Sequence, residues 1–334
     1  MPNPIAENKM IDSKNKTSFF MRWEFILIVL LVLILAFIAI LTPDIFTLRN
    51  LLDATITFTE KSILALPMAL LIISGVIDIS VASISAMAGV LMGVFFKSGV
   101  DLGTAVVLGL LVGVAAGFFN GVVITKLKIP SIVVTLATML IYRGVGYILL
   151  GDNAVRNLPE SFGVLGGAYG NLFIPIQAII FFVFTVIFGI ILQLSSFGRK
   201  IYIIGNNEHA ALYSGLHVDR IRIILTTVTG FVAALSGILL TSRIGSARPD
   251  IANGNEMMVI TIVLLGGVSI YGGKGTIPGV FLSCLILGYI HYGLVLLRIQ
   301  EQVIRIATGG LLIIALLIPT VVEKIRSLRK IQYE

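Results

Sequence analysis

The chain has 334 residues, of which 57% are hydrophobic and only 12% are charged, and its mean hydropathy is +1.05. Because a soluble domain carries about 25% charged residues, this composition excludes a soluble protein and predicts an all-α integral membrane protein. The formal net charge of +7 would suggest a nucleic-acid partner in a soluble chain. In a membrane protein it reflects basic cytoplasmic loops, so no nucleic acid is expected.

The N-terminus is a polar stretch, residues 1–24, followed by an unbroken apolar run, Phe25–Leu41. This run is longer than the core of a signal peptide, and no small-residue cleavage site follows it. It therefore predicts a retained first helix, with the polar stretch as a cytoplasmic tail.

About ten apolar segments are suited to cross a bilayer, which takes roughly 20 helical residues. They form one transmembrane domain over residues 25–320, followed by a basic cytoplasmic tail, residues 321–334. The second, third and eighth segments are short for a full crossing, which is typical of broken helices around a pathway. The predicted spans are Phe25–Leu41, Ser62–Val76, Ile84–Phe96, Gly103–Thr125, Pro130–Leu150, Leu172–Leu194, Ile223–Ser242, Met257–Ile270, Thr276–Leu297 and Gln302–Pro319.

Basic residues set the orientation of these spans. With the N-terminus inside, most Lys and Arg residues fall on the cytoplasmic side, which favours both termini inside. Three outside segments then look structured, namely Thr42–Lys61, Gly151–Asn171 and Arg243–Glu256. The glycine-rich second segment fits a flexible connector equally well, and the third either caps helices or receives a partner.

The stretch LLIISGVIDISVASIS carries Asp78 among apolar residues. A charge inside a bilayer is costly, so this carboxylate is expected to be partnered, hydrated or near the interface. Two interpretations stay open. Asp78 caps the third helix near the cytoplasmic surface, or it lies beside the gate of a polar pathway. Nearby Ser74 and Ser80 can satisfy backbone groups where the helix breaks.

The fourth span places glycines four residues apart, so that they line one helix face and let a neighbouring backbone approach closely. We expect these glycines to serve helix packing rather than substrate binding. Asn120 lies beside them, and it either bonds across helices or contacts the pathway. The glycines are Gly109, Gly113, Gly117 and Gly121.

The segment LGGVSIYGGKGTIPGV, residues 265–280, invites comparison with a phosphate-binding loop. The comparison fails, because Val268 stands where that loop needs its first glycine and Gly275 where it needs a hydroxyl. We interpret the segment as a tight cytoplasmic turn. The three histidines and the single cysteine, Cys284, have no metal-ligand spacing. No catalytic residue and no metal site are therefore predicted.

A basic, polar stretch, Ser195–Arg222, interrupts the apolar sequence and is predicted to lie in the cytoplasm. It resembles the coupling loop of ABC importer permeases, in the ribose, rhamnose and autoinducer-2 branch, whose loop reads F-G-R-x-x-x-x-x-G-x-N-x-x-A-A-x-x-S-G-I. GVIDIS resembles the branch's G-G-I-D-L-S, with Val76 in place of the second glycine and Ala82 in place of a later one. LGGVSIYGGKGTIPG resembles its L-G-G-x-S-x-x-G-G-x-G-x-x-x-G. The loop matches at Phe197, Gly198, Arg199, Gly205, Asn207, Ala210, Ala211, Ser214 and Gly215.

This resemblance implies a half-pore in the bacterial cytoplasmic membrane. A second permease subunit would complete the pore, ATPase subunits would bind below, and a soluble sugar-binding protein would deliver solute outside. ATP and Mg would be held by the ATPase, and no cofactor by this chain. The rhamnose and autoinducer-2 subgroup fits best. We expect residues 206–214 to form a short docking helix, in which Ala210 and Ala211 allow close approach of the ATPase. The implied coupling residues are Arg199, Gly205, Asn206, Asn207, Glu208, Ala210, Ala211, Ser214 and Gly215.

A neutral sugar is bound by hydroxyl, amide and aromatic groups. The candidate pathway residues are Ser74, Asp78, Ser80, Asn120, Thr135 and Tyr142. The alternative is a secondary transporter or channel for a small neutral solute, which would need no ATPase and would usually use intramembrane carboxylates for ion coupling. A membrane-embedded enzyme would need clustered histidines, carboxylates or cysteines, and the sequence has no such cluster.

Overall fold

The computed structural model describes residues 23–42, 47–167 and 174–300, with scattered residues between 302 and 317. The tails, residues 1–22 and 318–334, and half of the residues of the predicted tenth span, Gln302–Pro319, lie outside the described residues. Within the described ranges the chain is helical, and seven helices are long and apolar enough to cross a membrane. This agrees with the predicted all-α membrane fold.

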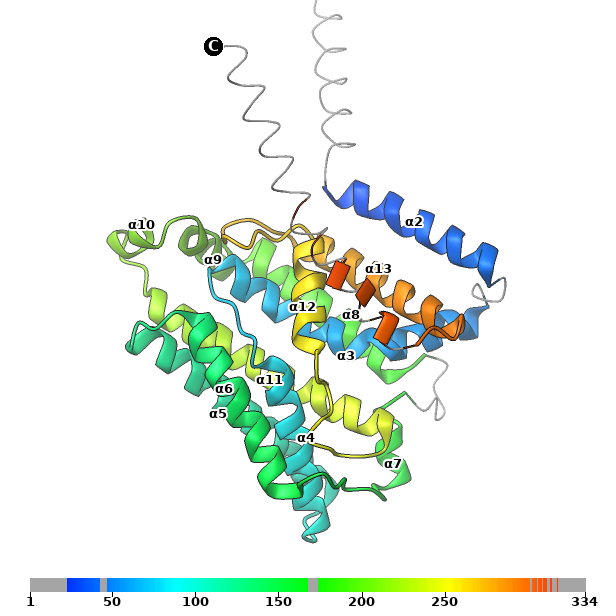
Figure 1. Cartoon of the computed structure of the whole chain (residues 1–334). Helices are drawn as coiled ribbons and strands as arrows, with labels where there is room; N and C mark the ends of the chain where they lie inside the picture. The colour runs from blue at the N-terminus through cyan, green and yellow to red at the C-terminus, as the bar shows by residue number, and fades with distance from the viewer. Residues whose placement is uncertain are drawn as a thin grey trace, which may run out of the picture.

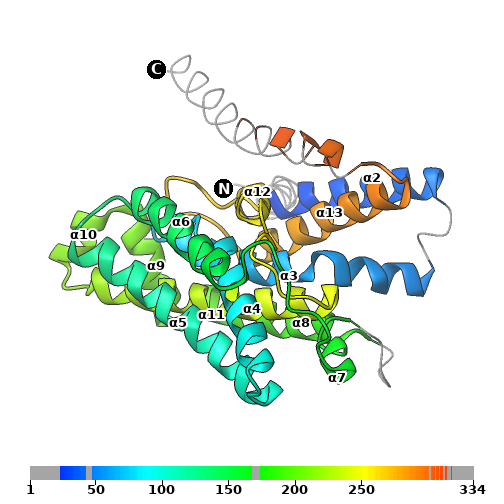
Figure 2. The ribbon, with the colours of Figure 1, turned by 60° about the horizontal axis from the view of Figure 1, so that its bottom comes forward.

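The helices follow the predicted apolar runs in order. Their bounds are α2 Trp23–Leu41, α3 Leu48–Ile73, α4 Val81–Lys97, α5 Leu102–Lys126, α6 Ser131–Leu150, α7 Glu160–Gly163, α8 Ile176–Gly189 continued by η2 Ile190–Leu194, α9 Ser196–Asn206, α10 Glu208–Tyr213, α11 Val218–Ile244, α12 Asn255–Leu265 and α13 Ile277–Leu296. As Figure 1 shows, α10 lies at one end of the bundle and α7 at the other, and Figure 2 agrees.

Helix α3 forms the centre of the bundle. It packs against α8, α11, α12 and α13. Of the residues in its 18-residue apolar stretch, 83% are buried. The long helix α11 lies beside it and also contacts α4 and α5. By contrast, only 11% of the residues in the corresponding stretch of α2 are buried. Helix α2 therefore presents most of its apolar surface outward, as a lipid-facing helix would.

The prediction of a short second span, Ser62–Val76, was wrong. Helix α3 begins at Leu48 and runs for 26 residues, through the charged pair Glu60–Lys61. Glu60 is fully buried and accepts a hydrogen bond from Arg243 Nε at 2.5 Å. Because its charge has this partner on α11, the carboxylate can occupy the middle of a buried helix. The third and eighth segments are short, as predicted: α4 has 17 residues and α12 has 11.

Two interruptions separate paired helices at the end of the bundle where α9 lies. The first break, Ser74–Ser80, joins α3 to α4, and the second break, Gly266–Thr276, joins α12 to α13. A glycine with positive φ follows the helix end in each, Gly75 at +85° and Gly267 at +84°, which is the usual way to end a helix. Gly273 N donates to Ile73 O at 2.9 Å, so the two breaks are bonded to each other.

The glycines of α5 lie where helices meet most closely. A Cβ atom at Gly113 or Gly117 would collide with the backbone of α11 around Gly230, and one at Gly121 would meet Ile223 and Thr226. Gly109 instead faces Ala88 and Met92 of α4. The stripe therefore lets α5 pack directly on its neighbours, as small residues do in membrane helices.

The segments at the α7 end are structured where they are described. Val155 and Ala247 exchange two backbone hydrogen bonds of 3.0 Å, which tie the segment after α6 to the segment after α11. Arg143 of α6 donates to Pro249 O at 2.7 Å and to Ile251 O at 2.8 Å. These contacts favour a packed segment after α6 over a flexible connector, up to the last described residue, Gly167.

Candidate coupling and translocation site

The island, defined here as residues 195–222, folds into two short helices. Ser195 Oγ accepts from Gly198 N at 3.1 Å and caps α9, and Asn207 Oδ1 accepts from Ala210 N at 3.0 Å and caps α10. These are side chains that helix N-termini favour. The expected helix over residues 206–214 is therefore corrected: Asn206 ends α9, and the second helix begins at Glu208.

Helix α9 is bonded to both breaks. Tyr202 donates its hydroxyl to Gly275 O at 2.6 Å, and Asn206 Nδ2 donates to Gly273 O at 3.3 Å. Burial raises the pKa of the Tyr202 phenol, which keeps the hydroxyl protonated as a donor. A Cβ at Gly205 would collide with Ile73 O and Gly273 N, so glycine is required at this junction.

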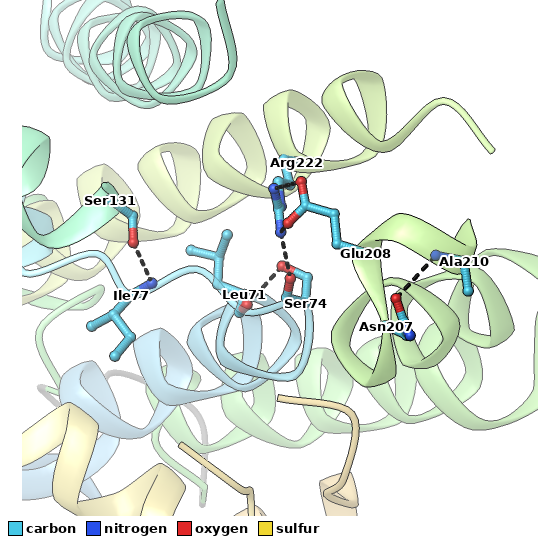
Figure 3. A network of polar contacts seen from close by, with 8 residues as sticks. All are labelled: Leu71, Ser74, Ile77, Ser131, Asn207, Glu208, Ala210 and Arg222. Carbon is cyan, nitrogen blue, oxygen red and sulfur yellow. Dashed lines mark hydrogen bonds and ion pairs between the residues drawn. The ribbon is translucent and has the colours of Figure 1, made fainter. Parts of the chain in front are cut away.

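Helix α10 is held to the first break by Arg222. The guanidinium of Arg222 donates from both Nη atoms to the Glu208 carboxylate at 2.8 Å, and Nη2 also donates to Ser74 O at 3.3 Å. Figure 3 shows Arg222 between Glu208 of α10 and the carbonyl that ends α3. One side chain therefore connects α10, the start of α11 and the first break.

The outward face of the island differs from the expected one at Ala211. Ala211 is fully buried against its own chain, whereas Ala210 is exposed. The expectation that Ala211 allows approach of a partner is corrected: its small side chain lets α10 pack on the bundle. Leu212 is 49% exposed and Tyr213 is 92% exposed. Sequence analysis missed this apolar pair, although adjacent apolar residues in a polar island were a visible signal.

The remaining island residues line its surface. Arg199 is exposed on α9, and Ser214 Oγ donates to Ala210 O at 2.8 Å. Gly215 has φ +78° and donates its N–H to Leu212 O at 3.0 Å, which ends α10. A Cβ there has open space, so the backbone conformation, not crowding, favours glycine.

Four of the predicted pathway residues meet in one buried network. Ser80 donates to Asp78 Oδ1 from N at 2.8 Å and from Oγ at 2.6 Å. Asn120 Nδ2 donates to Ser80 Oγ at 2.8 Å and to Asp78 Oδ2 at 3.4 Å. Tyr142 donates to Asn120 Oδ1 at 2.9 Å. The network joins the first break to α5 and α6, and no Lys or Arg in the described ranges forms an ion pair with Asp78.

The two other pathway candidates make mainly local bonds. Thr135 donates to Ser131 O at 2.9 Å and reaches Ile77 O at 3.4 Å, beside the network. Ser131 Oγ also accepts from Ile77 N at 3.2 Å, which ties α6 to the first break (Figure 3). Ser74 donates to Leu71 O at 2.7 Å within its own helix. All six candidates are buried within the described part of the chain.

Among the described residues, no group of three His, Cys, Asp or Glu side chains is placed to hold a metal ion. The chemistry that the site offers is therefore hydrogen bonding from neutral amide and hydroxyl groups, beside one carboxylate. Such groups suit the passage of a polar, uncharged solute.

Comparison with known proteins covers most of the chain. Residues 50–317 match the family described as "Branched-chain amino acid transport system / permease component". The "Autoinducer 2 import system permease protein LsrD" of Enterobacter sp. (strain 638) is 34% identical over 307 residues, covering 89% of this chain and 92% of that protein. The proteins of that name from Escherichia coli (strain K12) and Shigella flexneri are 35% identical over 298 residues, covering 87% of this chain and 90% of theirs. No solved structure matches the chain.

Proposed function

This chain belongs to the family of branched-chain amino acid transport system permease components, and from that premise we propose that it is the membrane subunit of an ATP-driven importer of autoinducer 2 or a closely similar sugar-like solute. The observation that carries the solute is the similarity over 87–89% of the chain to permeases named for autoinducer 2 import. The chain itself is a multi-pass membrane permease.

The buried network supports a neutral, hydroxyl-rich solute. Asn120, Tyr142 and Thr135 carry amide and hydroxyl groups that exchange hydrogen bonds with such a molecule, and the described network contains no cation that would select an anion. Opening of the first break would expose these groups. A second copy or a paralogous permease would supply the facing half of the path.

The partners proposed are ATPase subunits below the island, a second permease subunit, and a soluble solute-binding protein on the other side. ATP and Mg would be bound by the ATPase. We place the island end in the cytoplasm, since basic residues gather there. The exposed Leu212 and Tyr213 would then dock on the ATPase, because aromatic and aliphatic side chains dominate such contacts.

Coupling would run through the contacts of the island. A displacement of α10 would be transmitted to the end of α3 through the bond from Arg222 to Ser74 O. A displacement of α9 would be transmitted to both breaks through Gly205, Tyr202 and Gly275. Movement of the first break would pull Asp78 and Ser80 away from Asn120 and open the network.

The test is reconstitution in proteoliposomes with the ATPase, the second permease and the binding protein of the same system. We expect uptake of autoinducer 2 that requires ATP and the ATPase, with ribose and rhamnose as competing solutes. Uptake by the permease alone, driven by an ion gradient, would replace the proposal with a secondary transporter. ATP-dependent uptake of ribose but not autoinducer 2 would keep the mechanism and change the substrate.

A further inference from the structure

A basic pocket of about 880 Å³ lies between the α5–α6 turn and the α10–α11 segment. Its volume falls within the range of roughly 300–1,000 Å³ that small-molecule sites occupy. The basic side chains that line it come from both the α5–α6 turn and the α10–α11 segment. They are Lys126, Lys128, His209, His217, Arg220 and Arg222.

The two carboxylates in the lining are already engaged. Asp219 pairs with Lys126 at 3.3 Å, and Glu208 pairs with Arg222 at 2.8 Å. Lys128 and Arg220 have no ion-pair partner within the described part of the chain. The Nε atom of Arg222 is buried and has no hydrogen-bond partner among the described atoms. The pocket therefore keeps uncompensated positive charge and an unused donor.

Two long helices also begin at this pocket. Helix α6 starts at Ser131 and α11 at Val218, both of which line the pocket, and no described side chain caps either N-terminus. The first N–H groups of a helix lack partners inside the helix, and the helix dipole places partial positive charge there. Together with the basic side chains, these ends favour an anion with several acceptor oxygens.

We propose that this pocket binds a phosphate-class anion, held chiefly by Lys128 beside the first turn of α6 and by Arg220 from the other wall. A phosphate monoester carries about −1.5 to −2 charges at pH 7 and three acceptor oxygens, which matches the surplus charge and the several donors. The phosphate is carried by a soluble organic phosphate or by a lipid headgroup. Both present anionic phosphate oxygens to the pocket, and a phosphodiester headgroup does so with a single negative charge.

Occupancy would bear on coupling, a consequence that rests on the proposed function. An anion in the pocket competes with Glu208 for Arg222, because both lie in the lining and Arg222 joins α10 to the first break. A bound phosphate would then weaken that connection. The binding site itself stands independently of this effect.

The experiment measures binding by the full-length permease in nanodiscs, so its outcome does not depend on transport. Ribose 5-phosphate is titrated in phosphatidylcholine nanodiscs, with ribose as the uncharged comparison. The variant Lys128→Ala/Arg220→Ala removes two pocket cations. The matched control Lys97→Ala/Lys200→Ala removes two exposed cations outside this pocket. Thermal unfolding verifies that each variant is folded.

We expect ribose 5-phosphate to bind wild type and the control alike, and the pocket variant at least about tenfold more weakly. A second arm uses nanodiscs containing phosphatidylglycerol. If phosphatidylglycerol displaces ribose 5-phosphate from wild type, the lipid headgroup is the source of the phosphate. The same conclusion follows if wild type retains phosphatidylglycerol but does not bind ribose 5-phosphate, and the pocket variant does not retain the lipid. Equal binding by wild type and the pocket variant in both arms, or binding by neither, would overturn the proposal.

Discussion

Arg222 and Glu208 form a two-point ion pair, with both nitrogen-to-oxygen distances at 2.8 Å, and Arg222 also donates to Ser74 O at 3.3 Å. The Glu208 side chain is 46% exposed. The Arg222 side chain is only 16% exposed, but because the carboxylate is open to solvent the pair is screened and contributes on the order of 1 kcal/mol to stability. Its importance is therefore positional, because it fixes α10 relative to the end of α3.

Replacing Glu208 by Gln keeps the shape of the side chain and removes the charge that holds Arg222. We expect uptake by the reconstituted transporter to fall about tenfold, with the thermal unfolding temperature nearly unchanged. Arg222→Lys should act similarly, since the single ammonium nitrogen of lysine cannot reproduce the fork by which two guanidinium nitrogens contact Glu208 while one also contacts Ser74 O. Lys97→Ala, at an exposed position outside the island, serves as a surface control. Full uptake in both island variants would contradict a role in coupling.

Tyr213→Ala should weaken binding of the ATPase without disturbing the fold of the permease. The side chain is 92% exposed, so its removal costs the chain little, whereas a buried aromatic anchor in an interface is worth about 2 kcal/mol or more. Affinity measured by surface plasmon resonance should fall by at least about tenfold. Tyr147→Ala, at the opposite end of the bundle, is the matched control and should bind normally.

Ala211→Glu and Ala210→Glu should fail in different ways. Ala211 is fully buried, so a carboxylate there is desolvated and should unfold the island, which limited proteolysis detects. Ala210 is exposed, and its replacement should leave the island resistant to protease while reducing ATPase binding. Identical protease resistance of the two variants would show that α10 does not pack as described.

Gly117→Val should prevent α5 and α11 from packing, because the added side chain collides with Thr226 O and Gly230. Overpacking of this kind costs about 1–3 kcal/mol or more, so folded protein recovered in detergent should decrease sharply. Gly144→Ala on α6 is the matched control, since nothing lies within 4 Å of the added atom. Equal yields of the two variants would argue against the close α5–α11 approach.

Asp78→Asn should retain uptake within about twofold. The amide oxygen still accepts the two short bonds from Ser80 N and Oγ, so only the 3.4 Å bond from Asn120 to the second oxygen is lost, and no described cation depends on the carboxylate charge. Asp78→Leu should lose uptake, because it leaves those buried donors without an acceptor. Transport coupled to protonation of Asp78 predicts the opposite for the Asn variant, namely inactivity, so one uptake assay separates the two mechanisms.

Sequence patterns located most membrane helices because continuous apolar runs report burial in lipid directly. They failed at the start of α3, where the Glu60 charge is compensated by Arg243, a residue remote in sequence. They named Asp78, Asn120 and Tyr142 separately, but their meeting depends on how the first break packs against α5 and α6. The outward face of α10 was missed for the same reason, since burial of Ala211 is set by tertiary contacts.

The bonds from Gly273 N to Ile73 O and from Tyr202 to Gly275 O have a consequence for biosynthesis. During translation the island is synthesised before α12 and the second break. Its bonds to Gly273 and Gly275 can therefore form only after those later segments have emerged. Under the proposed function, a partner that recognises the positioned island would bind only chains that have been synthesised past this point.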